Sequence, residues 1–139
     1  MPIFQCTSPA GLLDDATKAN IAKEITRIHS DATGAPESFV NVLFHEAQAG
    51  TYFVSGRPSG HSIVFGAIRR GRDVETRQSM LSDLSHMWAR LTGQPEGEVL
   101  VTLAEVPAEN MIEGGLILPD PGQEQAWLAK HGARLAEPA

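Results

Sequence analysis

The sequence has a single cysteine, Cys6, and no apolar run long enough to cross a membrane. One cysteine cannot build an internal disulfide framework, which is typical of proteins from a reducing compartment. A membrane-spanning helix needs about 20 consecutive apolar residues. The first residues also lack the basic flank and long apolar core of a secretory signal. We therefore expect a cytoplasmic protein that does not enter a membrane.

Positive charge is scarce as well. Eleven Lys and Arg residues face 17 Asp and Glu residues, which gives a formal net charge of −6. A nucleic-acid surface needs clustered Lys and Arg, so we expect no nucleic-acid partner. The one dense basic cluster, Arg69, Arg70 and Arg72, is sufficient for one small anion. No pair of histidines has metal-ligand spacing, and we expect neither a metal nor a cofactor.

The chain contains an internal repeat. Residues 15–47 resemble residues 73–106. At a constant offset of 59 residues, Thr33-Gly34-Ala35-Pro36-Glu37 falls on Thr92-Gly93-Gln94-Pro95-Glu96. A length of 139 residues suits one domain. We therefore predict a single domain over 1–139, with half-repeats 2–47 and 61–106 and a C-terminal tail 107–139.

Each half-repeat is predicted to contain one amphipathic helix. Apolar residues recur every three or four positions, at Ile21, Ile25 and Ile28 in the first half and at Met80, Leu84, Met87 and Leu91 in the second. Asp14 or Asp15 can cap the first helix and Asp73 the second. Gly34 and Gly93, each with a proline two positions later, should end them.

Short apolar runs flank both helices and predict strands at 2–6, 39–46, 62–68 and 99–105. A helix between two strands favours a parallel, right-handed crossover. The expected fold is α/β (α+β), a tandem β-α-β repeat in a four-stranded mixed sheet with two helices on one face. The other face then needs cover, which we expect from other subunits. Residues 48–60 suggest an irregular excursion with a short strand at 51–54, and the tail from Pro119 suggests a short helix carrying Trp127 and Leu128.

Pro2 is the first candidate for chemistry. Removal of Met1 would leave a secondary amine at the start of a buried strand. Burial and nearby cations both lower the pKa of an amine, so such a group can act as a base or an acid near neutral pH. Many proteins begin Met-Pro, however, and with Met1 attached the Pro2 nitrogen is an unreactive amide.

Four further residues carry candidate groups, each with a structural alternative. Arg69 and Arg72 could present two guanidinium forks to one carboxylate, or form a solvated basic loop. His29 flanks the apolar stripe of the first helix and should point into the protein, where a lone histidine is more often structural. Glu113 follows Ile112 and precedes two glycines. A carboxylate in such surroundings can act on water or protons, or can be an ordinary surface glutamate.

Together these features resemble the cis-3-chloroacrylic acid dehalogenase branch of the tautomerase superfamily. The resemblance runs from Pro2 to the segment at 119–127 and includes the arginine pair and the strand-end segment at 105–114. It implies a β-α-β tautomerase fold that assembles as a homotrimer. It also implies roles: Pro2 as the catalytic amine, Arg69 and Arg72 as ligands of the substrate carboxylate, His29 as a group that holds or polarises substrate, and Glu113 as the carboxylate that activates water.

One position departs from the family pattern. Thr102 stands where the dehalogenases carry a tyrosine, and it lacks the reach and acidity of a phenol. The first hypothesis is therefore a keto-enol tautomerase of small 2-oxo or enol carboxylic acids that uses Pro2, with weak dehalogenase or hydratase activity. The alternatives are a cis-3-chloroacrylic acid dehalogenase and a non-catalytic trimeric binding protein.

Overall fold

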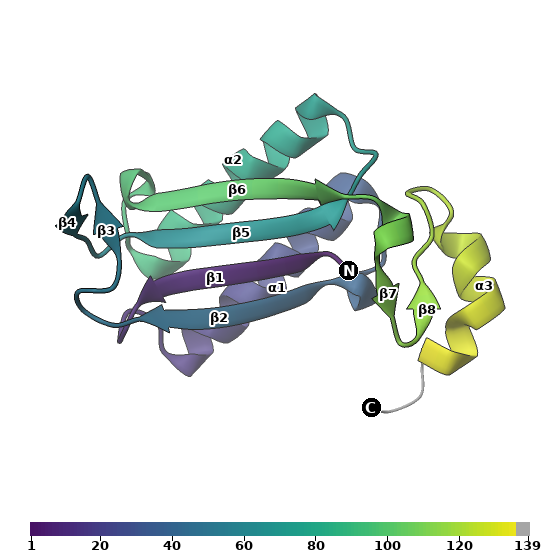
Figure 1. The fold of residues 1–139 in the computed structure, drawn as a ribbon, viewed down its shortest axis with the longest axis horizontal. Coiled ribbons are helices and arrows are strands. Elements are labelled where there is room, and N and C mark those ends of the chain that lie inside the picture. The colour runs from purple at the N-terminus through teal and green to yellow at the C-terminus, as the bar shows by residue number, and fades with distance from the viewer. Residues whose placement is uncertain (136–139) are drawn as a thin grey trace.

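The chain folds into two β-α-β units that share one sheet (Figure 1). The computed structural model describes residues 1–135. The first unit comprises β1 (Ile3–Pro9), α1 (Asp15–Thr33) and β2 (Asn41–Ala47). The second comprises β5 (Ser62–Arg69), α2 (Val74–Thr92) and β6 (Val99–Val106). The sheet order is β2-β1-β5-β6, parallel within each unit and antiparallel between β1 and β5, which confirms the predicted four-stranded mixed sheet.

The helix ends follow from local chemistry. The side chain of Asp14 accepts a hydrogen bond from the Thr17 amide, and that of Asp73 accepts one from the Thr76 amide, both at 2.7 Å. Gly34 and Gly93 end the helices at φ angles of 73° and 79°, in the left-handed region that favours glycine. Both predicted helices are therefore confirmed, and Asp14 is the cap of the first.

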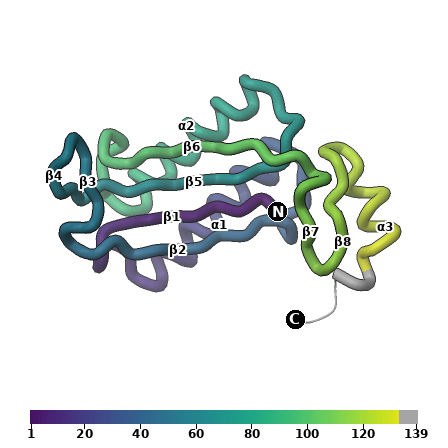
Figure 2. The backbone as a smooth tube through the Cα atoms, viewed as in Figure 1, coloured from purple at the N-terminus to yellow at the C-terminus, as the bar shows by residue number. Residues whose placement is uncertain are grey.

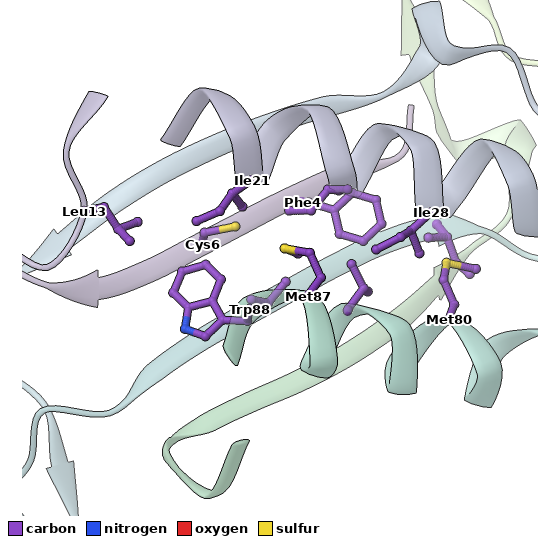
Figure 3. Close-up of a cluster of buried hydrophobic side chains, with 12 residues drawn as sticks. Phe4, Cys6, Leu13, Ile21, Ile28, Met80, Met87 and Trp88 are labelled. Atoms are coloured by element: carbon purple, nitrogen blue, oxygen red, sulfur yellow. The ribbon is translucent and has the colours of Figure 1, made fainter. Parts of the chain in front are cut away.

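The hydrophobic core lies between the two helices and one face of the sheet. Figures 1 and 2 show α1 and α2 behind the sheet, and Figure 3 shows side chains from both helices meeting Phe4 and Cys6 of β1. Phe4, Cys6 and Trp88 are fully buried. Burial raises the pKa of the Cys6 thiol to about 12, so this cysteine is a small core residue rather than a reactive thiol.

The opposite face of the sheet is open. Leu43, Phe65 and Leu100 project from it with 48%, 39% and 56% of their surfaces exposed. No helix within residues 1–135 covers this face, as the sequence led us to expect. An apolar sheet face of this kind is usually covered by another layer of protein.

Two small hairpins lie beyond the ends of the sheet, where the prediction was incomplete. β3 (Phe53–Val54) pairs with β4 (Arg57–Pro58), and β7 (Ile112–Glu113) pairs with β8 (Leu116–Ile117). In both turns the two central residues have positive φ, which is the hairpin geometry that glycine favours. The sequence predicts only a single strand at 51–54 in the first of these segments and no strand in the second.

Other boundaries also differ from the prediction. Three 3₁₀ turns precede or follow strands: η1 (Glu37–Phe39), η2 (Glu96–Glu98) and η3 (Ala108–Asn110). Phe39 therefore lies in a turn that follows Pro36, and the strand predicted from residue 39 begins at Asn41. The tail forms a helix of 12 residues, α3 (Glu124–Leu135), beside the second hairpin (Figure 1). None of the helices in the described part of the chain is long and apolar enough to cross a membrane.

Candidate active site

The N-terminus lies at the end of the sheet nearest β7 (Figure 1), and Met1 is partly buried there. Pro2 is fully buried at the start of β1, and its carbonyl accepts a hydrogen bond of 2.9 Å from the Asn41 amide. Met1 is attached, so the Pro2 nitrogen is an amide. The Met1 ammonium donates to the Phe39 carbonyl and to Glu113 Oε2, the latter at 2.9 Å. Pro2 and Glu113, 111 positions apart in the sequence, therefore belong to one small region of the fold.

The surroundings of this amine favour its neutral form. Burial is the largest cause that lowers the pKa of the Met1 amine, and the positive charge of Arg69 lowers it further. The hydrogen bond and the charge of Glu113 act in the opposite direction without cancelling the shift. An amine here loses its proton more readily than an exposed one.

A cavity of about 430 Å³ lies beside this amine. Its lining includes Met1 and Glu113, together with Ile3, Asn41 and Leu43 from the open face of the sheet. The volume is within the range of small-molecule sites. The cavity therefore offers space for a ligand next to both Glu113 and the N-terminus.

His29 of α1 is buried, with 3% of its surface exposed, and its ring contacts the Phe4 ring edge-on at a centroid distance of 6.0 Å. The pKa of His29 falls to about 4, first because of burial and then because of the charges of Arg72, Arg69 and the N-terminus. Its imidazole is therefore neutral at pH 7. Its Nδ1 atom is buried without a hydrogen-bond partner among the described residues. A histidine with unused hydrogen-bonding capacity beside two arginines is unusual for a purely structural residue.

Arg69 and Arg72 meet at one carboxylate. Arg69, at the end of β5, is 3% exposed and has its guanidinium 5.6 Å from the centroid of the Phe39 ring. It donates to the Pro119 carbonyl at 2.7 Å and to Glu124 Oε1 at 2.6 Å. Arg72 donates to the Thr33 carbonyl at 3.0 Å and lies 3.6 Å from the same Glu124 oxygen. The sequence predicts that both guanidinium groups bind a carboxylate. In the structure they do face a carboxylate, but it is the side chain of Glu124.

Burial, followed by the charge of Arg69, lowers the pKa of Arg72. The intervening Arg70 is exposed. The alternative of a solvated basic loop is therefore wrong for Arg69 and Arg72, although it describes Arg70 well.

Glu124 is the residue of this region that the sequence did not reveal. Its Oε2 atom accepts a hydrogen bond of 2.8 Å from the Gly122 amide. Burial alone would raise the pKa of Glu124, but backbone hydrogen bonds and Arg69 outweigh it, so the pKa is lowered and the group is ionised. The only signal in the sequence is an acidic residue soon after Pro121-Gly122, where a helix can start.

The approach of the tail to the arginines depends on Gly71. Its φ angle is 129°, which L side chains rarely adopt, and a Cβ atom there would lie 3.1 Å from Cγ of Pro121. Glycine at this position lets residues 119–124 close over the loop between β5 and α2.

Within one chain, Thr102 lies away from Arg69. It pairs with Phe65 in the middle of the sheet, whereas Arg69 pairs with Val106. Four residues of strand separate the two levels, or about 13 Å along β6. Within the described residues, no group of His, Cys, Asp and Glu side chains could hold a metal ion.

Comparisons with known proteins agree with this architecture. A family model described as "Putative oxalocrotonate tautomerase enzyme" matches residues 1–131. The chain is similar to the crystal structure of N1, a member of the cis-3-chloroacrylic acid dehalogenase family, with 35% identity, a TM-score of 0.88, and coverage of 91% of this chain and 90% of that one.

Two more solved structures resemble the chain. Native Ps01740 is 33% identical over 80% of this chain and 99% of that one, with a TM-score of 0.78. Pt0534 inactivated by 2-oxo-3-pentynoate is 26% identical over 90% and 98%, with a TM-score of 0.77. No curated protein matches the chain in sequence. The chain belongs to the tautomerase superfamily, in its cis-3-chloroacrylic acid dehalogenase-like branch.

Proposed function

We propose that this protein is a keto-enol tautomerase of small 2-oxo or enol carboxylic acids, and that the secondary amine of Pro2 transfers the proton after Met1 is removed. The observation that carries the proposal is the partly buried N-terminus, which lies beside a cavity of about 430 Å³ lined by Met1 and Glu113. Burial lowers the pKa of the Met1 amine despite the opposing effect of Glu113. We expect the same direction for the Pro2 amine once Met1 is removed. Membership of the tautomerase superfamily supports the same class of reaction.

The proposed reaction needs one group that moves a proton twice. The neutral amine of Pro2 takes the proton from the enol hydroxyl and returns it to the carbon, which leaves the ketone and regenerates the amine. Arg69 and Arg72 bind the substrate carboxylate and offset negative charge on the enolate. The unpartnered Nδ1 of His29 gives this neutral ring the capacity for one hydrogen bond to substrate.

A second candidate is the hydrolytic dehalogenation of a 3-haloacrylate. The position of Glu113, 2.9 Å from the terminal amine, favours it because this carboxylate could orient a water molecule. The similarity to N1 favours it as well. Thr102 argues against it, since this side chain replaces the tyrosine of the dehalogenases. We therefore expect ketonisation of an aryl enolpyruvate to be faster than chloride release from cis-3-chloroacrylate, and Thr102→Tyr to narrow the difference.

The chemical test combines intact mass with labelling. Mass spectrometry of the purified protein will show whether Met1 is absent, and 2-oxo-3-pentynoate, which inactivated Pt0534, will serve as the electrophile. We expect one adduct, mapped to Pro2, and loss of ketonisation in proportion to labelling. Cys6 is buried with a pKa of about 12 and should not compete. Labelling only at histidines, or a blocked N-terminus in an active protein, would refute the role of Pro2.

The assembly belongs to the same proposal. The open face of the sheet exposes Leu43, Phe65 and Leu100, and a fused 4-OT of the same fold forms a symmetric trimer. We expect a homotrimer, with a small carboxylic acid as its other partner. Sedimentation equilibrium at micromolar concentration tests this, and a stable monomer would contradict it. If the trimer forms but neither reaction is detected, the non-catalytic binding protein becomes the better description.

A further inference from the structure

The carboxylate of Glu124 lies where the proposed function requires the carboxylate of the substrate. Its Oε1 atom is 2.6 Å from Arg69 and 3.6 Å from Arg72, and the side chain is 12% exposed. The guanidinium of Arg69 is also capped by the Pro119 carbonyl and by the Phe39 ring. A substrate carboxylate can reach Arg69 only if Glu124 leaves.

The helix that carries Glu124 is held by few contacts. From Glu124 to Gly132 no residue of α3 is fully buried. Trp127 is its main anchor, since its indole N–H donates to the Ile117 carbonyl at 2.9 Å and its ring contacts Phe39 edge-on at 5.7 Å. Gly132 lies within the helix and lowers its intrinsic stability. A helix with so little buried surface can detach at low cost compared with the sheet.

We propose that Glu124 is an internal competitor for the carboxylate site and that α3 is a lid that opens when an acid substrate binds. This inference rests on the proposed role of Arg69 and Arg72. Glu124 compensates the charges of the buried Arg69 and the partly buried Arg72, and an incoming carboxylate replaces it without leaving them unpaired. Only acids that bind the two arginines better than Glu124 then enter. Glu124 thereby sets a threshold for affinity and favours carboxylates over neutral ketones.

The test compares carboxylate binding to the wild type and to Glu124→Gln. Propanoate is a suitable probe because it carries the carboxylate but cannot react, and its affinity is measured by calorimetry on the full chain after removal of Met1. A neutral amide competes poorly for the guanidinium groups, so Glu124→Gln should lower the Kd of propanoate by at least about 10-fold, the factor for one charge-assisted contact. Glu109→Gln, at an exposed position, is the control for the change in net charge and should leave the Kd unchanged.

A second variant keeps the carboxylate and loosens the lid. Trp127→Ala removes the anchor of α3 and should also lower the Kd of propanoate. Hydrogen exchange of residues 124–132 should increase when propanoate is added to the wild type. Weaker propanoate binding to Glu124→Gln, as expected if Glu124 only positions Arg69, would overturn the inference, and so would an unchanged Kd in both variants. Because the probe does not react, this result is independent of whether Pro2 is labelled or ketonisation occurs.

Discussion

His29 and Trp88 occupy equivalent positions in the two half-repeats, 59 residues apart, and both are buried, yet their surroundings differ. The indole N–H of Trp88 donates to Gln94 Oε1 at 2.8 Å. The same oxygen accepts from the Ser62 hydroxyl at 2.6 Å, and the Gln94 amide donates to the Gly60 carbonyl at 2.8 Å. His29 has no such network, since Ala35 replaces Gln94 and Nδ1 lacks a partner among the residues described.

Under the proposed function, this difference separates a structural position from a functional one within one duplicated fold. A buried polar group without a partner costs about 1–3 kcal/mol, so a half-repeat that serves only stability should satisfy its polar groups. At the Trp88 position the second half does so, although Arg77 Nε in that half lacks a partner among the described residues. At the equivalent position the first half leaves His29 Nδ1 unsatisfied, beside Ser30 Oγ, which also lacks a partner. His29 lies near two arginines and the N-terminus, where a ligand could supply the missing hydrogen bond.

The largest expected effect is on stability, at the satisfied position. Trp88→Ala should lower the free energy of unfolding by about 3–5 kcal/mol, because it creates a cavity and removes a donor from Gln94. Urea denaturation followed by circular dichroism measures this change. Equal losses for Trp88→Ala and His29→Ala would contradict the division of roles between the halves.

The next effect is on activity, at the unsatisfied position. His29→Leu should lower kcat/KM for ketonisation by about 10- to 150-fold, the loss expected for one hydrogen bond to a charged substrate. Its free energy of unfolding at pH 7 should change little, because an apolar side chain of similar size replaces a ring whose Nδ1 is unpaired. Steady-state kinetics and urea denaturation on the same sample measure both. A large loss of stability with unchanged kinetics would assign His29 to the core.

The same histidine should make stability depend on pH. The folded pKa of His29 is about 4, below its ordinary value of 6.5, so the unfolded state binds the proton first on acidification. This contribution is therefore fully present above pH 6.5 and is lost towards pH 4, by up to about 3 kcal/mol. Thermal melts between pH 4 and 7 should show a shallower slope for His29→Leu than for the wild type. Identical slopes would mean that other groups dominate acid denaturation.

The sequence predicts the repeated part of the fold better than it predicts the segment that follows the repeat. The repeat made α1, α2 and the sheet predictable, because apolar spacing, Asp14, Asp73 and the Gly-Pro breaks are local signals. The hairpin at 112–117 was missed, although Gly114-Gly115 is a usable signal for its turn. Glu124 could not be found this way. It is one of 17 acidic residues, and only the folding of the tail over Arg69 gives it a partner 55 positions away.

A smaller effect tests the network around Gln94. Gln94→Ala should lower the free energy of unfolding by about 1–3 kcal/mol, because it leaves the Trp88 indole and the Ser62 hydroxyl without their acceptor.

The matched change in the first half is Ala35→Gln, which offers His29 a partner at the equivalent position. Ala35→Gln should lower kcat/KM for ketonisation, because the new side-chain amide would occupy the Nδ1 atom of His29. Improved kinetics in that variant would argue against the proposed role of His29.

The smallest effect concerns a feature that the halves share. Asp14→Ala and Asp73→Ala each remove an N-cap hydrogen bond of 2.7 Å. Each substitution should lower the free energy of unfolding by about 1 kcal/mol, and the two losses should be equal within error. Differential scanning calorimetry can resolve them. A marked inequality would indicate that one half is intrinsically the weaker.

The enclosure of the N-terminus has a practical consequence for protein engineering. The Met1 ammonium is already held between the Phe39 carbonyl and Glu113, so a longer peptide joined there must displace this contact to reach solvent. An affinity tag or fusion partner on that side would alter the pocket even if the fold survived. Samples for study should therefore be made with a native start, or with a fusion whose cleavage releases Pro2 itself.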